Sequence, residues 1–268
     1  MVDTSTVAEE KKLPPPLEDD EDAELGASMS FLEHLTELRE RLIKSLIALA
    51  IGIAIAFMFK DVMMFIIKYP LPLNVQLQEL APAEGLMVTF KVAFVAGIFL
   101  AFPVLFYQAW MFIAPGLYKR ERRLVLPIIV SAWICFIIGG VLSYLTVFSL
   151  TLDFLSRFVP EIQAEWGLAN YVTFALRFIV AFGIVFEEPV VIFLLARIGL
   201  VTRASLIQFF PYATVTIFVV AAVITPPDPF SQILCALPLM LLYGLSIFIV
   251  GFVEKKQEGE EEEELDYE

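Results

Sequence analysis

The sequence predicts an all-α, polytopic integral membrane protein with six transmembrane helices. Of its 268 residues, 59% are hydrophobic and 18% are charged, and the mean hydropathy is +0.80. Soluble domains are closer to half apolar and a quarter charged. The apolar residues gather in long uncharged runs, and only helices or closed barrels can span a bilayer. These runs are too long and too continuous for barrel strands, so we expect helices.

The formal net charge of −13 belongs to the two ends of the chain. Residues 1–24 and residues 254–268 each hold nine acidic residues and two lysines, and the intervening residues carry a net charge of +1. The acidity therefore gives no indication of a nucleic-acid partner. We expect disordered acidic tails at 1–29 and 254–268 and a membrane domain at 30–253.

A helix is expected to precede the first span. Ser30 and Glu33 have the spacing of a capping box, which predicts a helix start. From Phe31 to Leu42, apolar residues recur at spacings of three and four and give the helix one apolar face. On periodicity alone, residues 30–44 form an N-terminal interfacial helix with a solvated charged face.

Six apolar runs reach or approach the roughly 20 residues that a membrane helix needs. We expect the spans at about 42–59, 92–112, 124–149, 171–196, 211–225 and 232–252. The fifth is short because Pro211 and the pair Pro226-Pro227 bound it. Pro238 should kink or weaken the sixth.

Lysines and arginines divide between two sets of loops. The richer set consists of Arg39, Arg41, Lys44, Lys119, Arg120, Arg122, Arg123, Arg197, Arg203, Lys255 and Lys256. The poorer set holds five basic residues across longer segments. The positive-inside rule then places both termini in the cytoplasm. Extracytoplasmic segments fall near 60–91 and 153–170 and at the turn TPPDPFSQ, residues 225–232.

The fourth run contains the pair Glu187-Glu188, followed by Pro189. Carboxylates at membrane depth are costly and mark functional or cavity-facing positions. Adjacent helix positions point about 100° apart, so the two side chains have different surroundings, and which of them faces a cavity stays open. Pro189 is expected to open the helix locally. An interhelical hydrogen bond is the second interpretation of this pair.

Two further acidic residues have structural alternatives. Glu121 lies among four basic residues, so it is either paired with them or functional, and its spacing does not decide between the two. Asp228 lies in a proline-rich turn, where capping of the last helix is the first interpretation.

The sequence offers no catalytic, metal or cofactor site. Its single histidine, His34, lies in the interfacial segment. Neither an HExxH motif nor a Walker motif occurs, and no Ser–His pair lies within a span. Cys135 and Cys235 sit in apolar runs, where we expect them to pack as small hydrophobic residues.

Four segments together resemble the TatC family, the receptor and core subunits of the twin-arginine protein translocase. They are FLEHLTELRERL (31–42), FIAPGLYKRERR (112–123), FEEPV (186–190) and TPPDPFSQ (225–232). They occur in the family's order, and the resemblance covers about residues 30–252.

The resemblance implies a cupped six-helix protein of the cytoplasmic (inner) membrane that is not an enzyme. Such a protein binds the twin-arginine signal peptides of folded cargo. It recruits TatA- and TatB-type single-span proteins and self-associates within the complex, and transport draws on the proton-motive force.

The resemblance also assigns site residues. The family's signal-binding carboxylates fall on Glu37 and Glu121. The chemistry agrees with that assignment, because carboxylates bind guanidinium groups in a bidentate geometry that lysine cannot reproduce. Residues of the same surface are Arg39, Phe112, Pro115, Leu117, Tyr118, Arg122 and Arg123. The intramembrane and partner-binding positions are Glu187, Glu188, Thr225, Asp228 and Gln232, and Pro70 matches a proline of the outer loop. Glu188 departs from the family, which has an apolar residue after the intramembrane glutamate.

Two other function classes are weighed against the translocase receptor. A proton-coupled carrier would use Glu187 or Glu188, but carriers often contain paired halves with matching broken helices, and the sequence has no such symmetry. An intramembrane protease lacks the residues that its chemistry requires.

Overall fold

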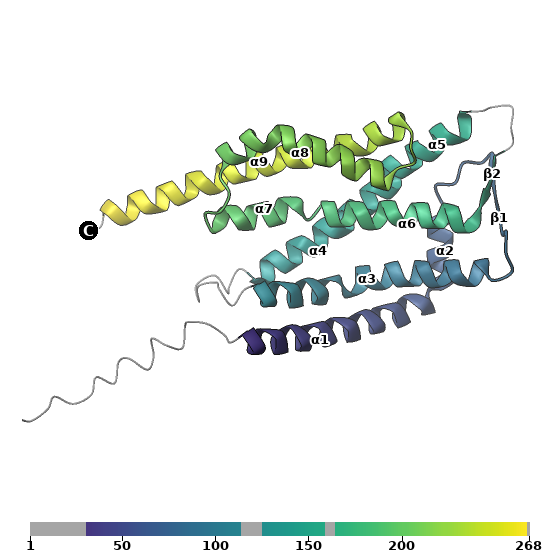
Figure 1. The fold of residues 1–268 in the computed structure, drawn as a ribbon, viewed down its shortest axis with the longest axis horizontal. Helices are drawn as coiled ribbons and strands as arrows, with labels where there is room; N and C mark the ends of the chain where they lie inside the picture. The colour runs from purple at the N-terminus through teal and green to yellow at the C-terminus, as the bar shows by residue number, and fades with distance from the viewer. Residues whose placement is uncertain (1–30, 114–124, 159–163, 267–268) are drawn as a thin grey trace, which may run out of the picture. The chain divides into compact units, whose positions relative to one another are not determined.

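The computed structural model describes residues 31–113, 125–158 and 164–266, and within them six helical segments are long and apolar enough to cross a membrane. The expected number of spans is therefore confirmed for these residues. In chain order, the elements are α1 (Phe31–Met58), α2 (Lys60–Lys68), β1 (Val75–Gln78), α3 (Glu84–Ile113), α4 (Val125–Leu142), a π-helical segment (Ser143–Phe148), α5 (Ser149–Arg157), β2 (Ala164–Gly167), α6 (Leu168–Val185), α7 (Glu188–Arg197), α8 (Arg203–Ile224) and α9 (Pro229–Asp266) (Figure 1).

The expected interfacial helix and the first span form one continuous helix, α1. A separate interfacial helix is therefore absent from the described residues, because no proline interrupts residues 31–58 and nothing else ends the helix. The described residues divide into two units, one that ends at Glu40 and one that begins at Arg41, and the second holds the packed spans. The expected N-terminal tail and the capping residue Ser30 lie outside the described residues.

The third and fourth spans are not uniform α-helices. The third consists of α4, the π-helical segment and α5. The fourth consists of α6 and α7, separated by Phe186 and Glu187. The expected local opening is confirmed, because Pro189 lies in the first turn of α7 and cannot donate a hydrogen bond to the carbonyl of Val185.

The fifth span is longer than the sequence suggested. Helix α8 begins at Arg203 and passes through Pro211, so the expected start at residue 211 is wrong. The Thr202 hydroxyl accepts a hydrogen bond from the Ser205 amide at 3.1 Å and fixes the true start. A proline inside a membrane helix is tolerated where its surroundings satisfy the freed backbone groups.

Helix α9 passes through Pro238 and continues to Asp266. Residues 254–266, which were expected to belong to a disordered tail, are therefore helical. The span supplies the helical nucleus, so extending the helix adds one hydrogen bond for each residue that is fixed. Glutamate, which dominates this segment, is also a good helix former.

The chain segments before α3 and α6 pair with each other, which the sequence did not predict. Strands β1 and β2 are parallel, with Val75 opposite Ala164. The Glu84 carboxylate accepts hydrogen bonds from the amides of Leu80, Ala81 and Ala169 at 2.6, 3.1 and 2.6 Å. Helices α3 and α6 therefore begin side by side and run in the same direction from this end.

The core of residues 41–268 is aromatic and aliphatic. Phe136, Phe148, Phe178 and Phe182 are among its largest fully buried side chains. Helices α3, α4 and α6 pack against one another around them (Figure 1). Close packing at Gly139 of α4 brings that helix against the break between α6 and α7, where a Cβ atom would lie 2.6 Å from the carbonyl oxygen of Phe182.

Candidate functional site

The residues expected to bind a signal peptide are described only in part. Glu37 and Arg39 lie in α1, where the side chain of Glu37 is half-buried and that of Arg39 is exposed. Phe112 lies near the end of α3 and is half-buried. The remaining members of the set, Pro115, Leu117, Tyr118, Glu121, Arg122 and Arg123, lie outside the described residues.

Pro70 follows α2 and is half-buried in the turn that leads to β1. Two tyrosines hold the end of α2 in place. The Tyr171 hydroxyl donates to the carbonyl of Ile67 at 2.8 Å, and the Tyr144 hydroxyl donates to the carbonyl of Ile66. The segment that contains Pro70 is thus fixed to the third and fourth spans.

Glu187 lies at the break in the fourth span. The amide of Glu187 donates to the carbonyl of Ile184 at 3.1 Å, and its own carbonyl accepts from the Val191 amide at 2.9 Å. The residue therefore joins the end of α6 to the beginning of α7. Its backbone is held by hydrogen bonds on both sides of the break.

The Glu187 side chain is buried, with 8% of its surface exposed. Cys135 of α4 lies close enough for its thiol to interact electrostatically with the Glu187 carboxyl group. Neither carboxyl oxygen has a hydrogen-bond partner among the residues that the structure describes. A buried polar group without a partner costs about 1–3 kcal/mol, and such groups in native proteins call for an explanation, of which a functional role is one.

Glu188 points to a different neighbour. Its side chain is half-buried and lies near Ser246 and Tyr243, both on α9. The two adjacent glutamates therefore have different neighbours, Cys135 of α4 for Glu187 and two residues of α9 for Glu188, as expected for consecutive helical positions. A cavity of about 360 Å³ lies between α4, α7 and α9, and neither glutamate lines it. Its lining residues are Ser131, Cys135, Ile138, Phe186, Pro189, Val190, Phe193, Leu242, Leu245 and Ile249.

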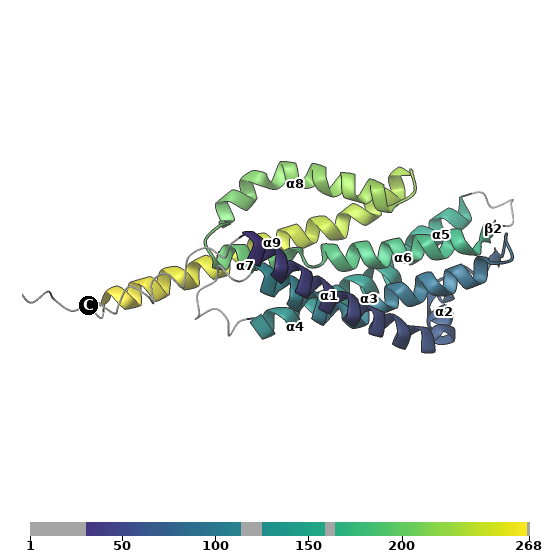
Figure 2. The same cartoon turned by 60° about the horizontal axis from the view of Figure 1, so that its bottom comes forward.

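The structure brings Thr225, Asp228 and Gln232 together at the turn between α8 and α9, which pack against each other (Figure 1 and Figure 2). Asp228 accepts a hydrogen bond from the Ser231 amide at 2.7 Å and caps α9, as the sequence indicated. The Gln232 amide donates to the carbonyl of Phe218 at 3.1 Å.

Two polar atoms at this turn have no hydrogen-bond partner in the described part of the chain. They are Oδ2 of Asp228 and the hydroxyl oxygen of Ser231, and both atoms are buried. Thr225 is also buried, but its hydroxyl donates to the carbonyl of Ala221 at 2.8 Å. The turn therefore combines an ordered backbone with polar groups that could bind a further donor or acceptor.

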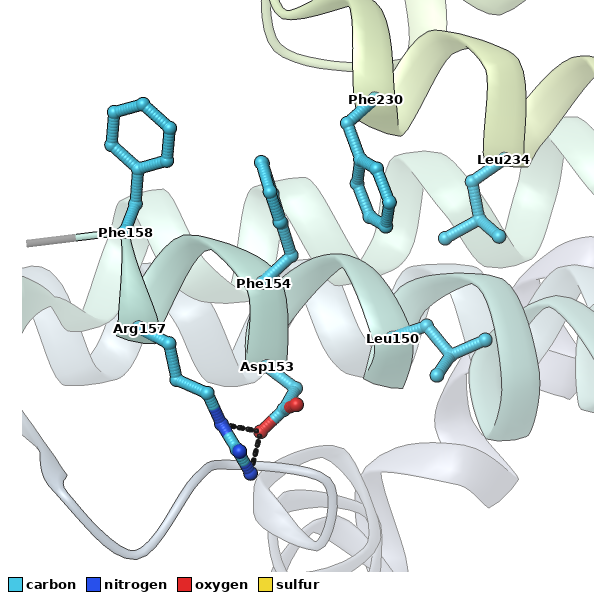
Figure 3. Close-up of a pocket in the computed structure, with 7 residues that line it drawn as sticks. All are labelled: Leu150, Asp153, Phe154, Arg157, Phe158, Phe230 and Leu234. Atoms are coloured by element: carbon cyan, nitrogen blue, oxygen red, sulfur yellow. Dashed lines mark hydrogen bonds and ion pairs between the residues drawn. The ribbon is translucent and has the colours of Figure 1, made fainter.

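A cavity of about 450 Å³ beside this turn was not predicted from the sequence. Figure 3 shows Phe154 of α5 facing Phe230 of α9, and their rings stack with centroids 4.0 Å apart. Asp153 and Arg157 point to the other side of α5 and form an ion pair at 2.8 Å. The spacing of aromatic residues on α5 indicates one wall of this cavity. The opposite wall belongs to α9, so only the tertiary structure reveals the cavity.

Comparisons with known proteins agree on one family. The family described as "Sec-independent protein translocase protein (TatC)" matches residues 33–238. A Sec-independent protein translocase protein TatC of Helicobacter pylori is 43% identical over 222 residues, covering 82% of this chain and 87% of the relative. The corresponding protein of Aquifex aeolicus is 38% identical over 235 residues, covering 85% and 98%.

A solved structure described as the twin-arginine translocase receptor TatC is similar to this chain, with a TM-score of 0.75 and 39% sequence identity. The match covers 81% of this chain and 99% of the solved chain. A second structure of the twin-arginine translocase receptor gives a TM-score of 0.73 at 38% identity.

Proposed function

Because the chain belongs to the TatC family of Sec-independent protein translocase proteins, we propose that it is the receptor and core subunit of a twin-arginine translocase. It is a transport component and not an enzyme. In this role it binds the twin-arginine signal peptides of folded proteins and recruits TatA- and TatB-type partners for export driven by the proton-motive force. The observation that carries the proposal is the similarity to a twin-arginine translocase receptor over 81% of the chain.

Glu37 and Glu121 are the residues proposed to bind the two arginines of the signal peptide. Each arginine presents a planar fork of N–H donors, which two carboxylate oxygens can accept in parallel. Lysine is a point charge without this fork and is a weaker ligand for the same carboxylate. The positions of Arg39 and Phe112 in the matched motifs support roles in shaping the surrounding surface.

Crosslinking of a twin-arginine signal peptide to the purified protein tests this assignment. Substituting Glu37→Ala or Glu121→Ala should remove most of the crosslink, because each change deletes one bidentate acceptor. Glu40→Ala, which changes a carboxylate one turn further along α1, is the matched control and should leave the crosslink intact. An undiminished crosslink in both test variants rules out the assignment.

Glu187 is proposed to take part in association with a partner span. Its two carboxyl oxygens are buried and have no described hydrogen-bond partner, so a donor on a neighbouring membrane protein would remove an energetic penalty. Glu187→Ala should weaken co-purification of a TatB-type partner while signal-peptide binding persists. Glu165→Ala, which removes an exposed carboxylate in β2 outside the proposed sites, is the control. Loss of signal binding without loss of the partner contradicts this role.

Thr225, Asp228 and Gln232 are proposed to form a second contact for partner spans. The unpartnered oxygens of Asp228 and Ser231 support this role, since a polar group on a partner span could bind them. Gln232→Leu should reduce partner association in the assembled complex. Thermal unfolding of the same variant separates this effect from the loss of the bond to the Phe218 carbonyl. Wild-type partner association in a folded variant eliminates the contact.

The orientation is proposed from the distribution of lysine and arginine, with both termini in the cytoplasm and the protein in the cytoplasmic membrane. Leu73 and Leu200 are exposed and lie in loops that this orientation places on opposite sides. In intact cells, an impermeant thiol reagent should label Leu73→Cys and not Leu200→Cys. The reverse labelling pattern would show that the orientation is the opposite one.

Self-association within the complex is proposed on the resemblance to the family.

A further inference from the structure

Two basic side chains lie within the spans on neighbouring helices. Lys91 belongs to α3 and Arg177 to α6, and both are exposed at the surface of residues 41–268. The Lys91 ammonium donates a hydrogen bond to the hydroxyl of Thr173 at 3.1 Å. Thr173 precedes Arg177 by four residues on α6, so these two side chains are neighbours on one face of that helix. The structure therefore gathers two positive charges and a hydroxyl at the α3–α6 surface.

Neither cation forms an ion pair with a residue that the structure describes. The nearby Glu84 carboxylate already accepts three backbone hydrogen bonds, and Asp153 is bound by Arg157. Basic side chains within the membrane are costly and normally pair with an opposite charge. The counter-ion of Lys91 and Arg177 is therefore expected from outside the described chain.

The depth of these residues indicates where that counter-ion lies. The bond between Glu84 and the Ala169 amide joins the starts of α3 and α6. Lys91 follows Glu84 by seven residues and Arg177 follows Ala169 by eight, which places both about 10–12 Å along their helices. Side chains on a helix lean toward its N-terminus, and long basic side chains extend toward the membrane surface. Both cations thus reach toward the headgroup layer at this end.

The neighbouring surface is suited to a lipid. Phe94 follows Lys91 by three residues on α3 and Ile184 follows Arg177 by seven on α6, so both lie deeper in the membrane on the same helix faces, and they are 47% and 60% exposed. At the start of α6, the exposed side chain is the polar Asn170. A polar and cationic region near the membrane surface, next to an apolar region deeper in the membrane, matches a phospholipid. The phosphate of such a lipid lies closer to the surface than its acyl chains.

We propose that Lys91 and Arg177 bind the phosphate of an anionic phospholipid headgroup, with Thr173 adding a hydroxyl contact and the acyl chains lying along α3. In the proposed orientation this lipid belongs to the extracytoplasmic leaflet, where the chain carries few other basic residues. The site uses none of the residues assigned to signal or partner binding.

Native mass spectrometry of the purified full chain with equal amounts of phosphatidylglycerol and phosphatidylcholine tests the proposal. The wild type should retain phosphatidylglycerol preferentially. Lys91→Gln or Arg177→Gln should each reduce this preference about fivefold, and the double variant about thirtyfold, as expected for two basic groups at a membrane surface. Arg157→Gln is the control, because that residue is at the same end but is paired with Asp153, and it should leave the preference unchanged.

Three outcomes would overturn the proposal. The double variant could keep the wild-type preference, or glycerol 3-phosphate in solution could displace the lipid, which would indicate a site for free phosphate. A Lys91→Cys variant could instead crosslink to an acidic residue of a partner span with no lipid preference in the wild type.

The charge-conserving pair Lys91→Arg and Arg177→Lys should retain the preference, which separates loss of the site from misfolding. Signal-peptide crosslinking to the double variant should stay at the wild-type level, so failure here is distinguishable from failure of the receptor role.

Discussion

The packing of α4 against the break in the fourth span depends on Gly139. A Cβ atom at this position would lie 2.6 Å from the carbonyl oxygen of Phe182 and 2.7 Å from the side chain of Phe186. One of these neighbours is a backbone atom of a packed helix, so it cannot move alone. Gly139→Ala should therefore force α4 away from the segment that carries Glu187.

The size of the effect follows from two opposing terms. Overpacking a close contact lowers the free energy of unfolding by about 1–3 kcal/mol. Replacing glycine by alanine inside a helix raises the same free energy by up to about 1 kcal/mol. Because the contact involves a backbone atom, the overpacking cost should lie in the upper part of its range. We therefore expect the free energy of unfolding to fall by about 2 kcal/mol in total. For a domain of roughly this size, that loss lowers the unfolding midpoint by about 5 °C.

Thermal unfolding of the purified protein in mild detergent measures this loss. Gly244→Ala on α9 is the matched control, because a Cβ atom there meets nothing within 4 Å. It should be neutral or stabilising by up to about 1 kcal/mol. If Gly139→Ala unfolds at the same temperature as Gly244→Ala, the close contact at the break does not hold α4 in place and the packing argument fails.

Three further experiments test local features of the fold and the cavity that Phe154 and Phe230 line. Asp228→Ala should lower the free energy of unfolding by about 1 kcal/mol while Asp228→Asn preserves it, since asparagine also caps helices; equal losses in the two variants would argue against the cap. A double-mutant cycle of Phe154→Leu and Phe230→Leu should give a coupling energy of about 0.5–1.5 kcal/mol for the stacked rings, and additive effects would exclude the stack. Arg157→Ala should change stability by less than about 1 kcal/mol, because its ion pair is exposed, and a larger loss in unfolding experiments would reveal another contact.

Local sequence was sufficient to predict those structural features that depend on a single helix or turn. The long apolar runs predicted the spans, because backbone hydrogen bonding within the bilayer leaves few alternatives. Pro189 predicted the break before α7, and Asp228 predicted the cap of α9, since each acts on the backbone within four residues. The divergence of Glu187 and Glu188 followed from helical geometry, but their neighbours on α4 and α9 became known only from the packing.

Features that depend on distant segments were missed or wrong. Pro211 predicts a helix start, but α8 forms through it and begins directly after its capping residue, Thr202. The pairing of β1 with β2 joins segments nearly 90 residues apart, and each strand has only four residues, too few for its sequence pattern to reveal the pairing. The cavity at Phe154 and Phe230 likewise requires α5 and α9 to meet.

The central claim is that a pair of carboxylates on this chain recognises paired guanidinium groups. The most direct test is the affinity of the purified protein in lipid nanodiscs for a signal peptide with two arginines and for the same peptide with two lysines. The arginine peptide should bind at least about tenfold more tightly, because lysine loses the bidentate bonds, and Glu37→Ala should remove that difference. Equal affinities for the two peptides in the wild type would contradict the account.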